Sequence, residues 1–195
     1  MQRISLVNIT HNLLKNKIFP GDIAIDATVG NGYDSLFLVE QVSPSGLVFG
    51  FDIQETAIGS SKNKIQQCRH PECLILIHRS HAEMTANIPL KYHGNINAIM
   101  FNLGYLPGGD KSVITNTDST LIALNNARQI LAIDGIITVM AYPGHSGGDF
   151  EAEQVKNWCN QLEKVQFKVD IIPSSADSKT APILFVIQKL TNPNL

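Results

Sequence analysis

The sequence predicts an α/β protein built on a doubly wound, mostly parallel sheet of seven strands with an antiparallel last strand. Three observations predict this fold. Short apolar runs alternate with longer segments of helical periodicity along most of the chain. The first two runs each lead into an acid, Asp26 or Asp52, and the first acid opens a glycine-rich turn. The last two runs flank a polar loop, as in an antiparallel hairpin.

The first half of the chain contains an opening helix and then three strands that alternate with helices. Apolar residues recur at helical spacing in the opening helix, which stops before Pro20-Gly21. The third strand is an unbroken apolar run, typical of a strand buried on both faces. The predicted elements are a helix over about Ile4 to Lys17, a strand from Ile23 to Ala27, a helix from Asp34 to about Val42, a strand leading to Asp52, a helix over about Glu55 to Cys68, and a strand from Cys73 to Ile77.

The second half repeats this alternation until the closing hairpin. A long glycine-bearing loop follows the fourth strand, and a second glycine-rich loop follows the fifth. The predicted elements are a strand from Ile96 to Phe101, a loop from Asn102 to Thr117, a helix near Asp118 to Ile133, a turn at Asp134-Gly135, a strand from Gly135 to Tyr142, a loop from Pro143 to Gly148, a helix from Phe150 to about Lys164, and hairpin strands from Phe167 to Ile172 and from Ile183 to Gln188.

Size and composition suit a single domain spanning residues 1–195, since 44% of the residues are hydrophobic and 16% charged. The longest apolar stretches, such as Gly135 to Tyr142, fall far short of the roughly 20 residues that span a bilayer, so no membrane contact is expected. Three cysteines without paired spacing suit a reducing, cytoplasmic setting. No metal is expected, because His78 and His81 have poor ligand spacing. The oligomeric state stays open.

The turn after the first strand, Asp26-Ala27-Thr28-Val29-Gly30-Asn31-Gly32, indicates a nucleotide-type ligand. Two glycines one residue apart let the backbone come close to a ligand, and the first N–H groups of the next helix point into the turn. Ser35 stands where a dinucleotide-binding turn has its third glycine. An acid, three residues and Gly-x-Gly instead form the S-adenosylmethionine (AdoMet) version of this turn. We expect the methionine end of AdoMet at Asp26, Thr28, Gly30, Asn31 and Gly32.

Further cofactor contacts are expected at the same edge of the sheet, because ligands of doubly wound sheets lie at the carboxyl ends of the strands. Asp52 follows the glycine turn by about twenty residues, where such folds hold a ribose, and Ile53 comes next. Ser80 and His81 follow the third strand and are expected beside the adenine. For His81, a surface histidine with a satisfied hydrogen bond is the alternative.

The segment Asn102-Leu103-Gly104-Tyr105 has the Asn and Tyr positions of the Asn-Pro-Pro-Tyr loop of methyltransferases that act on exocyclic amines. An asparagine carbonyl can accept a hydrogen bond from an amine and aim its lone pair at a methyl group, while an aromatic ring stacks on the base. We therefore expect Asn102 at both the cofactor and the amine, and Tyr105 at the substrate. A glycine-rich surface loop is the alternative.

Taken together, these segments resemble one family of bacterial methyltransferases, first labelled rRNA methylases and later assigned to wobble-uridine modification of tRNA (MnmM, also YtqB). The resemblance covers nearly the whole chain. It is carried by His11-Asn12-Leu13-Leu14, Asp26 to Asp34, Asn102 to Lys111, and Tyr142 to Gly148. The last two segments are specific to the family, whereas many methyltransferases share the glycine turn.

The resemblance implies a Rossmann-like class I methyltransferase fold and transfer of a methyl group from AdoMet to the aminomethyl nitrogen of 5-aminomethyl-(2-thio)uridine at the tRNA wobble position. Asp110 and His145 are candidates for accepting the amine proton or holding the amine, with loop capping as the alternative role. The expected substrate contacts are His11, Tyr105, Tyr142 and Gly144, although packing alone would also explain His11.

Other functions remain open on the sequence. The same site could serve a methyltransferase for rRNA or a small amine, an NAD-linked oxidoreductase, or a noncatalytic AdoMet-binding or RNA-binding module. The missing third glycine disfavours the oxidoreductase. A net charge of −2 means that RNA would have to be held by a local basic patch, such as Met1 to Gly21 or Ser60 to His81, unless these are solvated helix faces.

Overall fold

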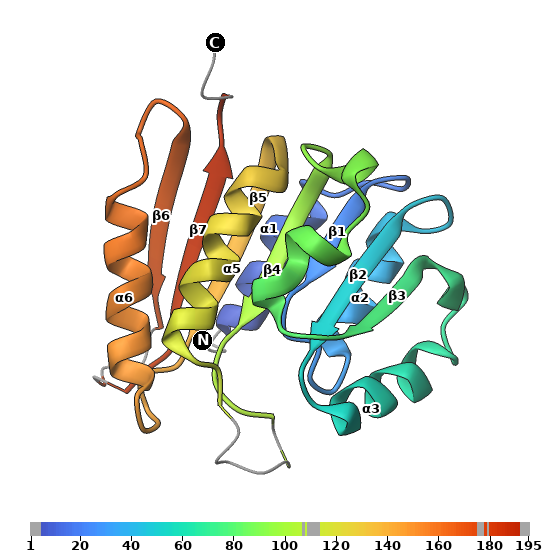
Figure 1. The fold of residues 1–195 in the computed structure, drawn as a ribbon, viewed down its shortest axis with the longest axis horizontal. Helices are drawn as coiled ribbons and strands as arrows, with labels where there is room; N and C mark the ends of the chain where they lie inside the picture. Colours follow the sequence, from blue (N-terminus) through green and yellow to red (C-terminus); the bar gives the residue numbers. More distant parts are fainter. Residues whose placement is uncertain (1–4, 107, 109–113, 175–177, 179, 192–195) are drawn as a thin grey trace.

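The computed structural model describes residues 5–106, 108, 114–174, 178 and 180–191. Their strands form one seven-stranded sheet in the order β3-β2-β1-β4-β5-β7-β6 (Figure 1). β7 runs antiparallel to both β5 and β6, and the other four strand pairs are parallel, which confirms the predicted fold class. The strands are β1 (Ile23–Asp26), β2 (Leu47–Asp52), β3 (Leu74–His78), β4 (Ile96–Asn102), β5 (Leu131–Ala141), β6 (Phe167–Pro173) and β7 (Ile183–Lys189).

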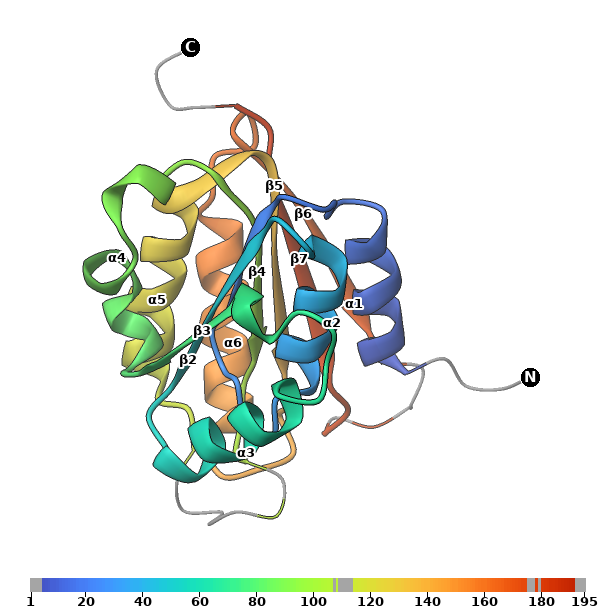
Figure 2. The same ribbon diagram turned by 90° about the vertical axis from the view of Figure 1, so that its right-hand side faces the viewer.

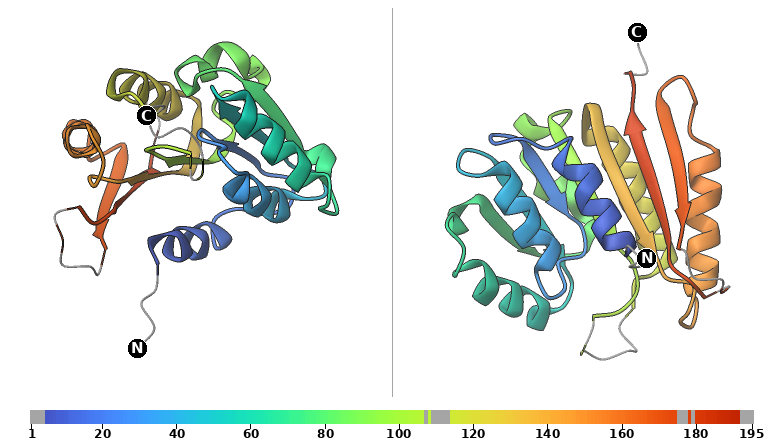
Figure 3. Two further views of the ribbon diagram at one scale, coloured as in Figure 1. Left: turned by 90° about the horizontal axis from the view of Figure 1, so that it is seen from below. Right: turned by 180° about the vertical axis from the view of Figure 1, so that it is seen from behind.

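Helices cover both faces of the sheet (Figures 2 and 3). Because side chains alternate along a strand, Ala24 and Val48 belong to the core on one face, while their neighbours Ile25 and Phe49 belong to the core on the other. The first face carries α1 (Leu6–Lys15), α2 (Tyr33–Val42) and α3 (Glu55–Ile65); the second carries α4 (Met84–Asn87), α5 (Thr117–Ile130) and α6 (Gly148–Asn160).

The strand order creates a switch point between β1 and β4. From β1 the chain winds outward through β2 and β3, and it then returns to the other side of β1 at β4. Loops that leave the carboxyl ends of β1 and β4 therefore diverge, which opens a crevice at this edge. The edge is the lower one in Figure 1, where β1, β2 and β4 end.

Two segments differ from the sequence-based expectation. The helix predicted to reach Ile133 ends at Ile130, because Leu131 already pairs with Ile96 of β4. The ladder then resumes at Ala98 and Ile136, so the predicted turn at Asp134, which has a φ of 62°, lies within a bulge of β5. The connection from β3 to β4 also contains short helices without a long apolar stripe: η2 (His81–Glu83), α4 and η3 (Leu90–Tyr92).

Gly59 offers a stability prediction within α3. A Cβ atom built on this helical glycine would meet no heavy atom within 4 Å. Because glycine costs conformational entropy in a helix, Gly59→Ala should raise the free energy of unfolding by about 0.5–1 kcal/mol. Urea denaturation followed by circular dichroism measures this change. Lower stability of the variant would mean that α3 is not a regular helix at this position.

Candidate active site

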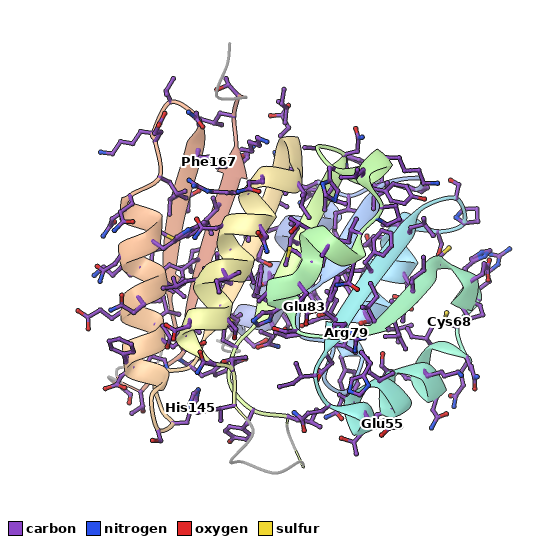
Figure 4. All side chains as sticks on the ribbon, viewed as in Figure 1. Glu55, Cys68, Arg79, Glu83, His145 and Phe167 are labelled. Atoms are coloured by element: carbon purple, nitrogen blue, oxygen red, sulfur yellow. The ribbon has the colours of Figure 1, made fainter. Side chains whose placement is uncertain are left out.

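A pocket of about 600 Å³ opens at the carboxyl edge of the sheet. Loops after β1, β2, β3, β4 and β5 all contribute to its wall. His145 and Glu55, the first residue of α3, lie on either side of this lower edge in Figure 4. The wall contains these residues predicted from the sequence: Thr28, Gly30, Asn31, Asp52, Ile53, Ser80, His81, Asn102, Tyr105, Tyr142, Gly144 and His145.

The glycine turn is tied to the end of β2. The backbone N–H of Val29 donates to the carbonyl of Phe51 at 3.0 Å, and that of Gly30 donates to Oδ2 of Asp52 at 2.9 Å. Gly32 has a φ of 76° and precedes α2, and a Cβ atom there would lie 2.5 Å from Oγ of Ser61. Gly32 therefore shapes the turn, but it does not belong to the pocket wall as predicted.

Asp52 presents its carboxylate at the pocket in a fixed orientation. Its Oδ2 accepts from Gly30, and its Oδ1 accepts from the backbone N–H of Gln54 at 2.8 Å. Each carboxylate oxygen can accept a further hydrogen bond. The arrangement therefore suits a ligand with two neighbouring hydroxyl groups, such as a ribose.

Asp26 lies beneath the turn and not in the pocket wall, contrary to the expected ligand contact. Only 1% of its surface is exposed. Its carboxyl group accepts from Oγ of Ser35 at 2.6 Å and from the backbone N–H of Thr28 at 3.1 Å. Burial, with the nearby charge of Asp34, raises the pKa of Asp26 to about 7. Asp26 thus supports the turn from below.

The raised pKa of Asp26 predicts a pH-dependent stability. The unfolded carboxyl has a pKa of 3.8, so between about pH 4 and 7 the folded protein binds more protons than the unfolded chain. The free energy of unfolding should therefore fall as the pH rises through this window and level off above about pH 7. Asp26→Asn should flatten the slope, as measured by urea denaturation at several pH values. Equal slopes for variant and wild type would contradict the assignment.

Ser80 and His81 line the pocket beyond β3. The ring of His81 is buried, with Nδ1 3.1 Å from the carbonyl of Ala27 and its edge against Phe101. Burial lowers the pKa of His81, which favours the neutral ring. Because a carbonyl only accepts, Nδ1 carries the proton and Nε2 keeps an acceptor lone pair. The alternative of a surface histidine with a satisfied hydrogen bond is therefore wrong in its position, because His81 is buried, although its hydrogen bond to Ala27 is made.

Asn102 ends β4 at the switch point. Its backbone N–H donates to Oγ1 of Thr28 at 2.7 Å, which connects the β1 and β4 loops. Its side-chain Nδ2 donates to Oδ2 of Asp34 at 3.4 Å, and Oδ1 of Asp34 lies 2.8 Å from Nε2 of His11. His11 does not line the pocket as the predicted substrate contact would require. Asp34 does line the pocket, and the sequence indicated it only as the last residue of the segment Asp26 to Asp34.

The loop after β4 is closed at its base by a buried carboxylate that sequence reasoning missed. The backbone N–H of Thr115 donates to the carbonyl of Gly104 at 2.8 Å, and the backbone N–H of Gly104 donates to the hydroxyl of Thr115 at 2.9 Å. Glu151 of α6, 3% exposed, accepts from the hydroxyls of Thr115 at 2.7 Å and Thr120 at 2.8 Å. Thr115 thus anchors the loop, and Asn116 caps α5. The predicted site residue Asp110 lies outside the described residues.

Aromatic rings gather where the loops after β4 and β5 meet. Tyr105 is 40% exposed and packs edge-on against His145, with ring centroids 6.1 Å apart. Nδ1 of His145 lies 3.1 Å from the carbonyl of Ser146, and its buried Nε2 has no hydrogen-bond partner among the described residues. Burial and the charge of Asp34 raise the pKa of Tyr142. The pocket therefore has two parts. The loops after β1, β2 and β3 form a polar part suited to a nucleotide-type cofactor, and the aromatic residues after β4 and β5 form a part suited to a flat, polar acceptor.

Two kinds of site are absent from the part of the chain that the structure describes. No three histidine, cysteine, aspartate or glutamate residues group there as metal ligands. In the same residues, no helix has the length and apolar character needed to cross a bilayer.

Several known proteins are similar to this chain in architecture and sequence. The chain is 38% identical over 162 residues to the "tRNA (mnm(5)s(2)U34)-methyltransferase, chloroplastic" of Arabidopsis thaliana, covering 79% of this chain and 58% of that protein. A Clostridium thermocellum structure titled a "putative rRNA-methylase" superposes with a TM-score of 0.91 at 35% identity, covering 97% of this chain and 100% of the other.

A Streptococcus mutans structure, titled a "putative methyltransferase" in complex with SAH, superposes with a TM-score of 0.83 at 32% identity. It covers 96% of this chain and 99% of its own. The model of the family described as "Putative rRNA methylase" matches residues 48–188. That match spans β2 to β7, including Asp52, Asn102 and His145. The chain therefore belongs to the "Putative rRNA methylase" family.

Proposed function

We propose that this protein is an AdoMet-dependent methyltransferase that methylates the aminomethyl nitrogen of 5-aminomethyl-(2-thio)uridine at the wobble position of tRNA. The observation that carries this proposal is that one pocket holds both Asp52, with the glycine turn, and Asn102, with Tyr105. The name of the Arabidopsis relative supports the substrate, and the SAH in the Streptococcus mutans protein supports the cofactor. The chain spans only 58% of the length of that Arabidopsis relative.

The pocket fits AdoMet in size and in polar groups. Its volume of about 600 Å³ lies within the range of sites for cofactor-sized ligands. We assign the ribose to Asp52, the adenine to Ile53, Ser80 and His81, and the methionine end to the turn from Thr28 to Asn31. Asp26 and Gly32 would act by shaping that turn. AdoMet supplies a methyl group already activated on a positively charged sulfur.

The protein's own task is then to align a neutral amine. We propose that Asn102 accepts a hydrogen bond from the amine and that Tyr105 and Tyr142 pack against the base, with Gly144 leaving room beside them. Alignment of this kind can contribute several kcal/mol to the reaction. Of the two predicted proton acceptors, His145 lies in the pocket wall and Asp110 lies outside the described residues, so we assign that role to His145.

The rim of the pocket supports a nucleic-acid substrate. Tyr33 lines the pocket and is 67% exposed. The Nζ atom of Lys64 lies over its ring, 3.7 Å from the ring centroid. An exposed ring beside a cation can stack on a base and attract a phosphate. We propose the tRNA anticodon region as the partner and the cytoplasm as the place of reaction, in keeping with the free thiols of Cys68, Cys73 and Cys159.

Mass spectrometry of nucleosides from cells that lack this protein tests the proposal. The unmethylated 5-aminomethyl-(2-thio)uridine should accumulate in tRNA, and a plasmid copy of the gene should restore the methylated form. Unchanged tRNA nucleosides would contradict the substrate assignment. The family's description favours rRNA as the second candidate, so rRNA nucleosides from the same cells should be compared; a methyl group lost only there would establish that function instead.

A further inference from the structure

A chain of three side chains runs from outside the pocket to the proposed amine-binding residue. His11 of α1 contacts Asp34 of α2, and Asp34 contacts Asn102 at the end of β4. We propose that His11 and Asp34 are positioning residues that hold the carboxamide of Asn102 with its oxygen facing the acceptor, so that the site selects an acceptor atom that carries hydrogen. This inference rests on the proposed amine methylation.

Contacts with Phe37 and Asp34 fix the side chain of His11, although it lies outside the pocket wall. Its ring stacks on Phe37 with centroids 3.9 Å apart and planes 2° from parallel. Its side chain is 22% exposed, and Nε2 lies 2.8 Å from Oδ1 of Asp34. Since an ionised carboxylate only accepts hydrogen bonds, Nε2 carries the hydrogen. The stack on Phe37 fixes the direction of that donor.

The polarity of Asp34 sets the orientation of Asn102. With Oδ1 occupied by His11, Oδ2 of Asp34 faces the carboxamide of Asn102 at 3.4 Å. Only the NH₂ end of a carboxamide can donate to a carboxylate, because the oxygen end would be repelled. The backbone of Asn102 is meanwhile fixed by the hydroxyl of Thr28. Rotation of the carboxamide is therefore the remaining freedom, and Asp34 restricts it.

This orientation determines which atom the site can hold. The oxygen of Asn102 is directed away from Asp34 and can only accept a hydrogen bond. A primary amine can donate one N–H to it and keep its lone pair for the methyl group. An oxo, thio or ether atom has no hydrogen to donate, so it would leave the asparagine oxygen unpaired. The three residues thus favour transfer to the amine nitrogen over the oxo and thio atoms of a modified uridine base.

The variants His11→Phe and His11→Gln test this role. Phenylalanine keeps the stack on Phe37 but removes the donor, whereas the amide of glutamine can donate from a similar position. We expect His11→Phe to lower kcat by about tenfold, the usual scale for loss of a hydrogen bond to a charged group. Affinity for S-adenosylhomocysteine, measured by calorimetry, should stay at the wild-type value, and His11→Gln should recover most of kcat.

A second readout does not depend on turnover. The side-chain amide resonance of Asn102, assigned by its loss in Asn102→Asp, should shift in ¹H–¹⁵N spectra of His11→Phe and return toward its wild-type position in His11→Gln. His93→Phe is the matched control, because Nε2 of His93 lies 3.0 Å from the carbonyl of Ile88, outside the pocket wall and outside both basic segments. We expect it to change neither kcat nor the Asn102 resonance.

The outcomes separate this inference from the proposed function. An unmoved Asn102 resonance in His11→Phe would overturn the positioning role, even if the protein methylates tRNA. Cofactor affinity that falls as much as kcat would also overturn it, because Asp34 would then serve the cofactor. If the wild type fails to methylate the aminomethyl uridine, the proposed substrate is wrong, while the resonances still report whether His11 orients Asn102.

Discussion

Asn102→Ala is expected to lower kcat for methyl transfer by about 10²- to 10³-fold, the usual effect of removing one group that orients or stabilises the reacting atoms. The backbone of Asn102 keeps its bond to Thr28, so the strand end should stay in place. Binding of S-adenosylhomocysteine should therefore change little. Initial rates with tRNA that carries the aminomethyl uridine measure kcat, and calorimetry measures the affinity for S-adenosylhomocysteine.

The matched control for this variant is Asn157→Ala. Asn157 is exposed in α6 and does not line the pocket, so its replacement should leave kcat unchanged. Turnover by Asn102→Ala at the wild-type rate would show that Asn102 does not hold the amine. The noncatalytic alternative, an AdoMet-binding or RNA-binding module, instead predicts no methyl transfer by the wild type or by either variant.

Asp52→Ala should weaken binding of AdoMet by about 1–3 kcal/mol, or roughly 5- to 150-fold in Kd. The variant removes the proposed ribose acceptor and also leaves the N–H groups of Gly30 and Gln54 without their partner. Asp52→Asn should lose less, because its one remaining oxygen can still accept from one of these groups. Calorimetric titration with AdoMet measures the Kd of the wild type, of Asp52→Ala and of Asp52→Asn.

A control separates binding from folding in this experiment. Thermal unfolding followed by circular dichroism shows whether Asp52→Ala is still folded at the titration temperature. A folded variant with wild-type affinity for AdoMet would refute the ribose assignment. Wild-type protein that prefers NADH to AdoMet in a fluorescence titration would instead revive the oxidoreductase alternative.

The apolar runs predicted the seven strands because the central strands are buried, and burial leaves a direct record in residue type. The expectation that the third strand is buried on both faces was wrong, since β3 lies at the edge of the sheet and Ile75 is 42% exposed. The glycine turn and Asp52 were likewise predictable as pocket-forming segments, since positive φ angles at Gly30 and Gly32, with a close approach to Ser61 at Gly32, favour glycine at those positions. The carboxyl ends of parallel strands meet at one edge, so the convergence of these loops followed from the fold.

What the sequence could not predict depends on contacts between distant segments. His11 bonds to Asp34 across 23 positions, and Glu151 reaches Thr115 across 36. No local periodicity marks such pairs, so His11 was expected at the substrate and Glu151 was missed. The early end of α5 has the same origin, because pairing of Leu131 with β4 overrides the helical pattern. Asp26 was expected at the ligand, whereas packing places it beneath the turn.

Reconstitution with purified components tests the central claim most directly. The protein is incubated with AdoMet carrying a deuterated methyl group and with tRNA that bears 5-aminomethyl-2-thiouridine, and the digested nucleosides are analysed by tandem mass spectrometry. The account predicts one labelled methyl group on the aminomethyl nitrogen of the wobble nucleoside, strongly reduced with Asn102→Ala. Label on a ring atom of the base, on the ribose or on no nucleoside at all would contradict the account.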